Sequence, residues 1–355
     1  MSDFSVGERF KVTLFGQSHG PAVGCVMEGF PAGFTPDGEK ISTFMARRAP
    51  GQNAWSTPRK EADQPEILSG LNENGQTCGA PITAVIRNSN THSADYAVLK
   101  DIPRPGHADY TAHCKYGEAW DSRGGGQFSA RLTAPLCFAG ALAKQFLEEK
   151  GVFIAAHIAR IGTVKDAKSD TVNPHLPFYE KNVFPVIDSE KGEAMKAAIE
   201  AARQRGDSVG GDVECFITGL PIGLGGPYFG GLEGKLAQAL FGIPAVKGVQ
   251  FGDTQSHGSE NNDAFTVKDG AVRTVTNHAG GILGGITNGM PVYFTVSFKP
   301  TPSIAKPQQS VNLKFMTETA LTIQGRHDPC VVPRAVPVVE AVAAIVLLDI
   351  LLQGV

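Results

Sequence analysis

Three consecutive glycines, Gly124 to Gly126, constrain the fold more than any other stretch of this sequence. Glycine loses more backbone freedom on ordering than any other residue, so this run cannot form the interior of a stable helix or strand. Arg123 and Arg131 flank the run, and an apolar stretch at 132–147 that predicts a helix follows it. Backbone N–H groups beside a helix N-terminus favour phosphate or carboxylate. Read alone, the segment is more typical of a plain glycine hinge between solvated arginines.

The composition is that of a soluble globular protein, with 42% hydrophobic and 19% charged residues. A net charge of -3 gives no signal for binding to nucleic acid or to a membrane. The six cysteines form no C-x-x-C pair, which argues against a zinc ribbon or a disulfide framework and fits a reducing compartment. The first residues lack a basic and apolar signal segment. The longest apolar run, 336–352, contains Glu340 and Asp349, so we expect a buried core or subunit-contact helix and not a membrane span.

Hydrophobic periodicity predicts mixed α and β structure. We expect strands at 9–15, 25–28, 66–71, 81–87, 152–164, 209–220 and 292–298, and helices at 132–150, 189–204 and 232–241. Ser189 is the expected N-cap of the second helix and Gly206 its stop. The residues 47–51 and 59–60 are expected to form a basic loop that either clamps an acidic ligand or is solvated.

Several loops combine glycine or proline with histidine, arginine, lysine or serine, and one site assembled from these loops explains the pattern. Its ligand would be multiply anionic, because arginine suits bidentate contacts to carboxylate and phosphate. The phosphate-loop and G-x-G-x-x-G patterns are absent from the sequence, and its histidines lack metal-ligand spacing. Ser18 and His19 are adjacent, which fits a Ser-His-Asp hydrolase poorly. Each histidine alone is more often structural, but together they are general acid candidates.

In this order, the clusters resemble the chorismate synthase family from about Gly7 onward. The motifs are G-Q-S-H-G at 16–20, R-P-G-H-A-D-Y at 104–110, R-G-G-G-Q-F-S-A-R at 123–131, N-H-A-G-G-I-L-G-G-I at 277–286, K-P-T-P-S-I at 299–304 and G-R-H-D-P-C at 325–330. The resemblance implies a lyase that converts 5-enolpyruvylshikimate 3-phosphate to chorismate and phosphate by 1,4-anti elimination. The reaction requires reduced FMN but causes no net redox change. Two carboxylates and a phosphate on the substrate agree with the arginines, and the flat ring and phosphate of the flavin agree with the glycine loops.

The resemblance also implies the fold and the cellular setting. We expect an α+β protein in which residues 1–355 form a single domain, a β-α-β layered sandwich with antiparallel sheets. The family implies a cytoplasmic homotetramer in the shikimate pathway of aromatic amino acid biosynthesis. The expected partner is the small-molecule substrate, with no nucleic acid, membrane or metal.

Residue roles follow from the resemblance alone. His107 would protonate the departing phosphate, His19 would stabilise the anionic reduced flavin, and Asp328 would lie near flavin N5 and help to remove the substrate proton. Ser18 and Ser129 would support this proton network. The substrate's anionic groups are assigned to Arg48, Arg104, Arg131 and Arg334. FMN is assigned to Gln127, Phe128, Ser129, Pro244, Ala245, Gly284, Lys299, Pro300, Thr301, Pro302, Ser303 and Arg326.

The chain departs from many family members at Gln17, where they have glutamate, and at Ala49, Ala54 and Gln127, where they have arginine. These departures weaken the case for flavin reduction by NADPH on this chain, so an external flavin reductant is expected. They also leave two alternatives open, which are a flavin-dependent redox enzyme on the same scaffold and an inactive ligand-binding paralogue.

Overall fold

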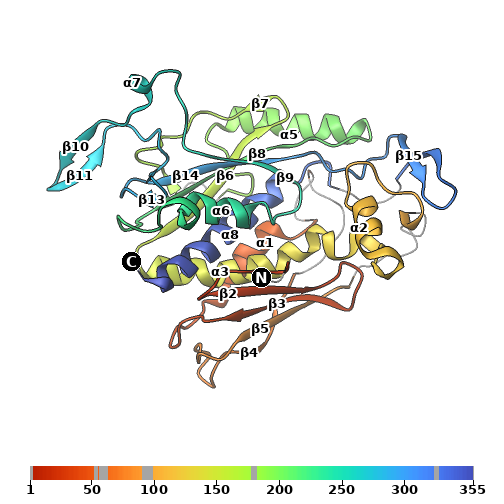
Figure 1. Ribbon diagram of the computed structural model, residues 1–355, viewed down its shortest axis with the longest axis horizontal. Coiled ribbons are helices and arrows are strands. Elements are labelled where there is room, and N and C mark those ends of the chain that lie inside the picture. The colour runs from red at the N-terminus through yellow and green to blue at the C-terminus, as the bar shows by residue number, and fades with distance from the viewer. Residues whose placement is uncertain are drawn as a thin grey trace.

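Two five-stranded antiparallel sheets enclose a layer of helices in the computed structural model of this protein (Figure 1). The structure describes residues 3–51, 55, 63–89, 99–176, 182–323 and 328–354. In Figure 1 the first sheet lies below helices α3 and α8 and the second sheet lies above them. This is the α+β, β-α-β layered architecture with antiparallel sheets that the resemblance implies.

The first sheet has the strand order β1-β2-β3-β5-β4. Its strands are β1 (Ser5–Val6), β2 (Lys11–Gly16), β3 (Ala22–Glu28), β4 (Glu66–Ser69) and β5 (Ile82–Arg87). Successive side chains of a strand point to opposite faces of a sheet, so one face can be buried while the other meets water. On β3, Val23, Cys25 and Met27 alternate in this way and are fully buried against the helices.

The second sheet has the strand order β7-β6-β8-β14-β9. Its strands are β6 (Phe153–Ile161), β7 (Val164–Lys165), β8 (Gly211–Thr218), β9 (Val246–Phe251) and β14 (Val292–Phe298). The central strands bury both faces. On β8, Cys215 and Ile217 join the main core, whereas Phe216 packs with Ala155 and Tyr293 in a separate apolar cluster.

Four helices form the layer between the sheets. They are α1 (Gly38–Arg48), α3 (Thr133–Glu149), α6 (Leu232–Leu240) and α8 (Val332–Gln353). The crossing of α3 and α8 depends on Gly140, where an added Cβ would lie 2.2 Å from the Cβ of Ala341. A helix that is apolar on all sides must be buried on all sides, and α8 satisfies this condition because sheets and helices cover it.

Among the described residues, α8 alone is long and apolar enough to cross a membrane by length and composition, and 89% of its most apolar window is buried inside the protein. The long apolar run therefore lies at the centre of the fold, as the sequence predicts for a core helix.

A buried carboxylate on α8 links the helix layer to the second sheet. Glu340 is 0% exposed and accepts two hydrogen bonds of 2.8 Å from the guanidinium of Arg47. It also accepts the backbone N–H of Ala156 on β6 at 2.9 Å. Burial alone would raise the pKa of Glu340, but the charges of Arg47 and Lys144 outweigh it and hold the pKa below its usual value. Breaking such a buried pair strongly destabilises a fold.

A second buried polar group, the His157 cluster, lies on the second sheet. It consists of His157 on β6, Glu214 on β8, and Asp166 and Ser169 from the connection after β7. His157 Nε2 lies 2.9 Å from Glu214 Oε2, and Nδ1 lies 3.4 Å from Asp166 Oδ2. Burial would lower the pKa of His157, but the hydrogen bonds and charges of the two carboxylates outweigh it and raise the pKa. The cluster fastens the polar connection that follows β7 to the sheet.

The remaining elements surround the layers. The helices are α2 (Asp109–Tyr116), α5 (Ser189–Gln204) and α7 (Gly258–Asn261), with short 3₁₀ turns η2 (Gly117–Ala119), η3 (Arg123–Phe128), η4 (Ala130–Leu132) and η5 (Tyr228–Gly230). Three hairpins pair β10 (Phe265–Lys268) with β11 (Ala271–Thr274), β12 (Ile282–Leu283) with β13 (Ile286–Thr287), and β15 (Gln308–Asn312) with β16 (Thr317–Leu321).

One expected loop is a helix. Arg47 and Arg48 occupy the last turn of α1, so the prediction of a basic loop there was wrong. The helix begins because the Asp37 side chain accepts the backbone N–H groups of Glu39 at 2.9 Å and Lys40 at 3.1 Å. The other half of that expected loop, 59–60, lies outside the described residues.

The N-cap of α5 also differs from the expectation. Asp188 caps this helix by accepting the backbone N–H of Glu190 at 2.8 Å, and Ser189 is its first helical residue. Aspartate and serine are both good N-caps, so the sequence alone did not separate them.

Candidate active site

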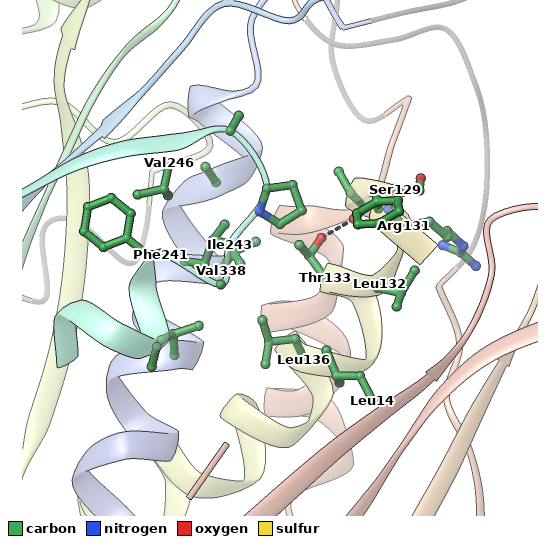
Figure 2. A pocket seen from close by; sticks show the side chains of 18 of the residues that line it. Leu14, Ser129, Arg131, Leu132, Thr133, Leu136, Phe241, Ile243, Val246 and Val338 are labelled. Carbon is green, nitrogen blue, oxygen red and sulfur yellow. Dashed lines mark hydrogen bonds between the residues drawn. The ribbon is translucent and has the colours of Figure 1, made fainter. Parts of the chain in front are cut away.

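A cavity of about 1560 Å³ opens between the first sheet, the beginning of α3, α8 and the α6–β9 connection (Figure 2). Apolar side chains form one wall: Leu14 comes from β2, Leu136 from α3, Val338 from α8 and Ile243 from the connection. Charged and polar side chains from loops and helix ends line the other part. This division suits a ligand pair with both flat apolar and anionic surfaces.

The three-glycine run brings two loops together beside this cavity. Gly124, Gly125 and Gly126 have φ values of 61°, 84° and 54°, which side-chain-bearing residues rarely adopt. An added Cβ on Gly124 would lie 2.0 Å from Nδ1 of His19 and 2.9 Å from Oγ of Ser18. The backbone N–H of Ser18 donates to the carbonyl of Gly126 at 3.2 Å. The glycines therefore let the loop with Ser18 and His19 lie directly against the segment that leads into α3.

Ser129 ends the glycine segment and orders the next turn. Its hydroxyl accepts the backbone N–H of Arg131 at 3.2 Å and so caps η4. This cap directs the Arg131 side chain to the buried side of the turn. There its Nε donates to Asn88 Oδ1 at 2.9 Å.

Asp63 joins two predicted substrate arginines. Its carboxylate accepts from the guanidinium groups of both Arg48 and Arg131, and all three side chains are buried. Burial alone would raise the pKa of Asp63, but the charges and hydrogen bonds of the two arginines outweigh it and lower the pKa. Arg48 is held further by Thr133 Oγ1 at 3.0 Å. Two cations share one anion here, so the group keeps a net positive charge facing the cavity.

A second cluster combines Arg104, His107 and Asp109 at the start of α2. Asp109 accepts Nε of Arg104 at 2.7 Å and Nη2 at 2.8 Å, and it lies 2.6 Å from Nδ1 of His107. Arg104 Nη1 also donates to Ser303 Oγ at 3.1 Å, which connects the cluster to the 299–304 segment. Burial would raise the pKa of Asp109, but hydrogen bonds from Arg104 and His107 hold it far below its usual range.

Burial has the opposite effect on His107, whose pKa it lowers. The hydrogen bond that His107 donates to Asp109 opposes this shift, and the charge of Arg104 adds to it, so the pKa lies below the usual value for histidine. An added Cβ on Gly125 would lie 3.3 Å from Nε2 of His107, which places this nitrogen against the glycine run.

Asp328 and Arg334 form a third ion-paired group in the lining of the cavity. Arg334 Nη1 donates to Asp328, and Nε donates to the carbonyl of Arg48 at 2.9 Å. Because Arg48 in turn bonds to Asp63, the pair of Asp328 and Arg334 is contiguous with the group of Arg48, Asp63 and Arg131.

Most of the residues predicted for the site line this one cavity. They are Ser18, Arg48, Arg104, His107, Gln127, Phe128, Ser129, Arg131, Pro244, Ala245, Lys299, Thr301, Pro302, Ser303, Asp328 and Arg334. His19 lies behind the lining, against Gly124. Pro300 does not line the cavity itself but adjoins residues that do. Their roles remain predictions.

Two predicted cofactor residues are placed differently. Gly284 occupies the tight turn between β12 and β13, has a φ of 62°, and does not line the cavity. Arg326 lies outside the described residues, as does the departure at Ala54. Of the other departures, Gln127 lines the cavity and Ala49 is buried as the C-cap of α1.

The carboxylates that hold the cations, Asp63 and Asp109, were not among the residues predicted for the site. Asp109 stands within the R-P-G-H-A-D-Y motif, so its distance of two residues from His107 was the available signal. Asp63 had no comparable signal, because it follows a stretch with no recognised periodicity. Within the described part of the chain, no group of three or more His, Cys, Asp or Glu side chains could hold a metal ion.

Comparisons with known proteins give one consistent result. The family model described as chorismate synthase matches residues 10–352. A chorismate synthase of Lancefieldella parvula is 45% identical over 368 aligned residues, covering 99% of this chain and 97% of the relative. One of Methanosarcina barkeri is 46% identical, with 98% and 96% covered. A solved structure described as "Crystal Structure of Chorismate Synthase" has a TM-score of 0.74 and 30% identity, with 98% of this chain and 93% of that one covered.

Proposed function

Because the chain belongs to the chorismate synthase family, we propose that it converts 5-enolpyruvylshikimate 3-phosphate to chorismate and phosphate by 1,4-anti elimination. In this reaction the allylic C–O bond to phosphate breaks, the phosphate leaves with the bonding electrons, and a proton is lost from the ring. It is a carbon–oxygen lyase reaction that needs reduced FMN without net redox change. The observation that supports it most directly is that His107 and four arginines from separate loops and helix ends line one cavity.

The arginines account for recognition of the substrate. Arg48 and Arg131 share Asp63, and Arg334 pairs with Asp328, so each guanidinium is held rigidly before the ligand arrives. A guanidinium has five N–H donors, and the bonds from Arg104 to Asp109 and Ser303 use three of them. Donors therefore remain at Arg104 for a carboxylate or phosphate of the substrate. Fixed cations also stabilise the negative charge that develops on the departing phosphate.

His107 is the proposed acid for the leaving phosphate. An imidazole suits this role because the ordinary pKa of histidine lies near neutral pH. Nε2 of His107 is presented beside the glycine run. The arrival of a phosphate dianion would favour the imidazolium, since an opposite charge raises the pKa of histidine. His107 would thus gain its proton as the substrate binds.

We assign the removal of the ring proton to Asp328, supported by Ser18 and Ser129, and assign stabilisation of the anionic flavin ring to His19. Asp328 lies beside Arg334, and Ser18 lies with His19 against Gly124. Asp328 and the proposed acid His107 belong to different ion-paired groups, Asp328 with Arg334 and His107 with Asp109. This arrangement would separate the group that takes a proton from the group that gives one.

The residues present fit FMN. The apolar wall suits a flat ring, and Lys247 and Lys299 line the cavity where a phosphate would be held. Burial and the charge of Lys247 both lower the pKa of Lys299, so an anion there would relieve the repulsion between the lysines. Among the described residues, the buried hydroxyl of Thr301 has no hydrogen-bond partner and retains its bonding capacity for a ligand. Bound in its reduced form, FMN supplies electron density to the allylic system as the C–O bond breaks.

The wider setting follows from the same family. We propose that residues 1–355 act as one domain in a cytoplasmic homotetramer, in aromatic amino acid biosynthesis. Gln127 and Ala49 stand where many members have arginine, so we propose that an external reductant, and not NADPH on this chain, reduces the flavin.

An anaerobic assay tests the function. Purified protein, dithionite-reduced FMN and 5-enolpyruvylshikimate 3-phosphate are mixed, and chorismate absorbance and phosphate release are followed together. Stoichiometric chorismate and phosphate without consumption of reductant support the lyase. Net reductant consumption per turnover would indicate a redox enzyme, and binding without turnover would indicate an inactive paralogue.

His107→Ala tests the role of the proposed acid. We expect the variant to bind FMN as the parent does and to lose turnover by about 100-fold or more, the range for a general acid. Chorismate formation near the parent's rate would refute that role.

A further inference from the structure

We propose that Asp109 is a positioning residue that fixes the tautomer of His107, so that Nε2 is the nitrogen that exchanges a proton with the leaving phosphate. The proposal rests on the function proposed above and adds a residue that had no assigned role. Asp109 is 1% exposed and belongs to the first turn of α2, so it is part of the scaffold of the cavity and does not line it.

Hydrogen bonds hold both oxygens of Asp109 in place. Oδ2 accepts the backbone N–H of Arg104 at 3.0 Å and its Nε at 2.7 Å. Oδ1 accepts Arg104 Nη2 at 2.8 Å and faces Nδ1 of His107 at 2.6 Å. These contacts leave the carboxylate no freedom to rotate away from His107.

The charge of Asp109 decides which ring nitrogen carries the proton. Hydrogen bonds from Arg104 and His107 outweigh burial and keep this group ionised, and an ionised carboxylate can only accept hydrogen bonds. Nδ1 of His107 must therefore be the donor. Arg104 Nη2 lies 3.1 Å from the same Nδ1, but it cannot donate to a protonated nitrogen and bonds to Asp109 instead.

The consequence for Nε2 follows directly. In the neutral ring Nε2 carries the lone pair, and in the imidazolium it carries the proton that can be given away. The charged groups that face His107 are Asp109, Arg104 and Lys299. Burial and the charges of the two cations together lower the pKa of His107, so the neutral ring is favoured without ligand, and an incoming phosphate changes this balance.

Replacing the carboxylate by an amide should reverse the tautomer. In Asp109→Asn, the buried backbone N–H of Arg104 and its Nε still require an acceptor at the Oδ2 position. The amide oxygen would occupy that position, which turns the NH₂ group toward Nδ1 of His107. Nδ1 must then accept, and the proton moves to Nε2. A neutral ring with its proton on Nε2 cannot take up a further proton there, as in a protease triad where the same exchange of aspartate for asparagine produces the wrong tautomer.

The test reads the tautomer directly by ¹⁵N NMR of histidine-labelled protein without ligands, at a pH above the ring pKa. Signals of His107 are identified by their loss in His107→Ala. We expect the Nδ1–H tautomer in the parent and the Nε2–H tautomer in Asp109→Asn. In the anaerobic assay, kcat of Asp109→Asn should fall by about 100-fold or more, with a smaller change in KM. Its pH profile should also lose the limb due to His107.

Asp212→Asn is the matched control. Asp212 on β8 makes a similar bidentate contact with Arg160, at 2.5 and 2.8 Å, and does not line the cavity. This variant should keep the parent tautomer of His107 and the parent kcat. A comparable loss of kcat in both variants would overturn the proposal, because the loss would then come from breaking an arginine pair.

Two further outcomes decide the matter. An Nε2–H tautomer in the parent overturns the proposal even if Asp109→Asn does not fold. Retention of the Nδ1–H tautomer in a folded Asp109→Asn also overturns it. If the parent forms no chorismate, the proposed function fails, and with it the catalytic part of this proposal. The spectra would still report the role of Asp109 in holding the tautomer, so the two failures are distinguishable.

Discussion

Gly124→Ala tests whether the close approach of the two loops is necessary for the reaction. The added methyl group would start 2.0 Å from Nδ1 of His19. Because ordinary contact begins near 3.4 Å, the imidazole must retreat by about 1.4 Å. Misplacing a reacting group by about 1 Å can cost about 100-fold in rate. We therefore expect kcat to fall by about 100-fold or more in the anaerobic assay.

The same substitution also carries a backbone cost. Gly124 has a φ of 61°, and alanine in this region costs about 1–2 kcal/mol. Gly151→Ala separates this cost from the clash, because Gly151, in the turn that ends α3, has a φ of 78° and open space around the added Cβ. Both variants should lose similar stability in urea unfolding, but only Gly124→Ala should lose turnover.

If Gly124→Ala folds and keeps more than about a tenth of the parent's kcat, then the position of His19 is not critical. If Gly151→Ala loses as much activity as Gly124→Ala, then the loss comes from backbone strain and not from contact with the ring.

Two other perturbations address buried charges. Asp63→Asn removes the carboxylate shared by Arg48 and Arg131, and we expect a loss of about 3–5 kcal/mol, or about 4–7 °C in Tm for a chain of this length. Inorganic phosphate should restore more stability to this variant than to the parent. Glu66→Gln, in an exposed pair, should leave Tm unchanged, and an unchanged Tm in Asp63→Asn would contradict the prediction. For His157, whose folded pKa is raised, the protonated ring stabilises the fold below the unfolded pKa of about 6.5, and this stability is lost as pH rises through the folded pKa. Urea unfolding from pH 6 to 9 should show this loss in the parent and not in His157→Gln; parallel curves would argue against it.

The sequence predicted the parts of this protein whose signals are local. The apolar run at 132–150 predicted α3, which spans Thr133–Glu149. The alternating pattern at 9–15 predicted β2, which spans Lys11–Gly16. The clusters at 16–20, 104–110 and 123–131 do meet at one cavity, whereas the glycine-rich cluster at 277–286 does not line it.

What could not be predicted depends on distant contacts. Helix α1 was missed because its apolar residues Ile41, Phe44 and Met45 are few and lie among polar ones, so burial against α3 and α8 stabilises it more than its own pattern does. Asp63 looked like any surface carboxylate, since only the fold brings Arg48 and Arg131 to it. The layering itself came from the family resemblance, because periodicity alone gave only mixed α and β structure.

The position of α8 has a consequence for how the chain acquires its shape during synthesis. Translation proceeds from the N-terminus, so the strands of both sheets are synthesised before Val332–Gln353, the helix that packs between the sheets. Until then, the face of β6 and β8 that packs against α8 lacks this partner. Completion of the core is therefore a late event in synthesis, and chains halted before α8 would be natural clients for chaperones.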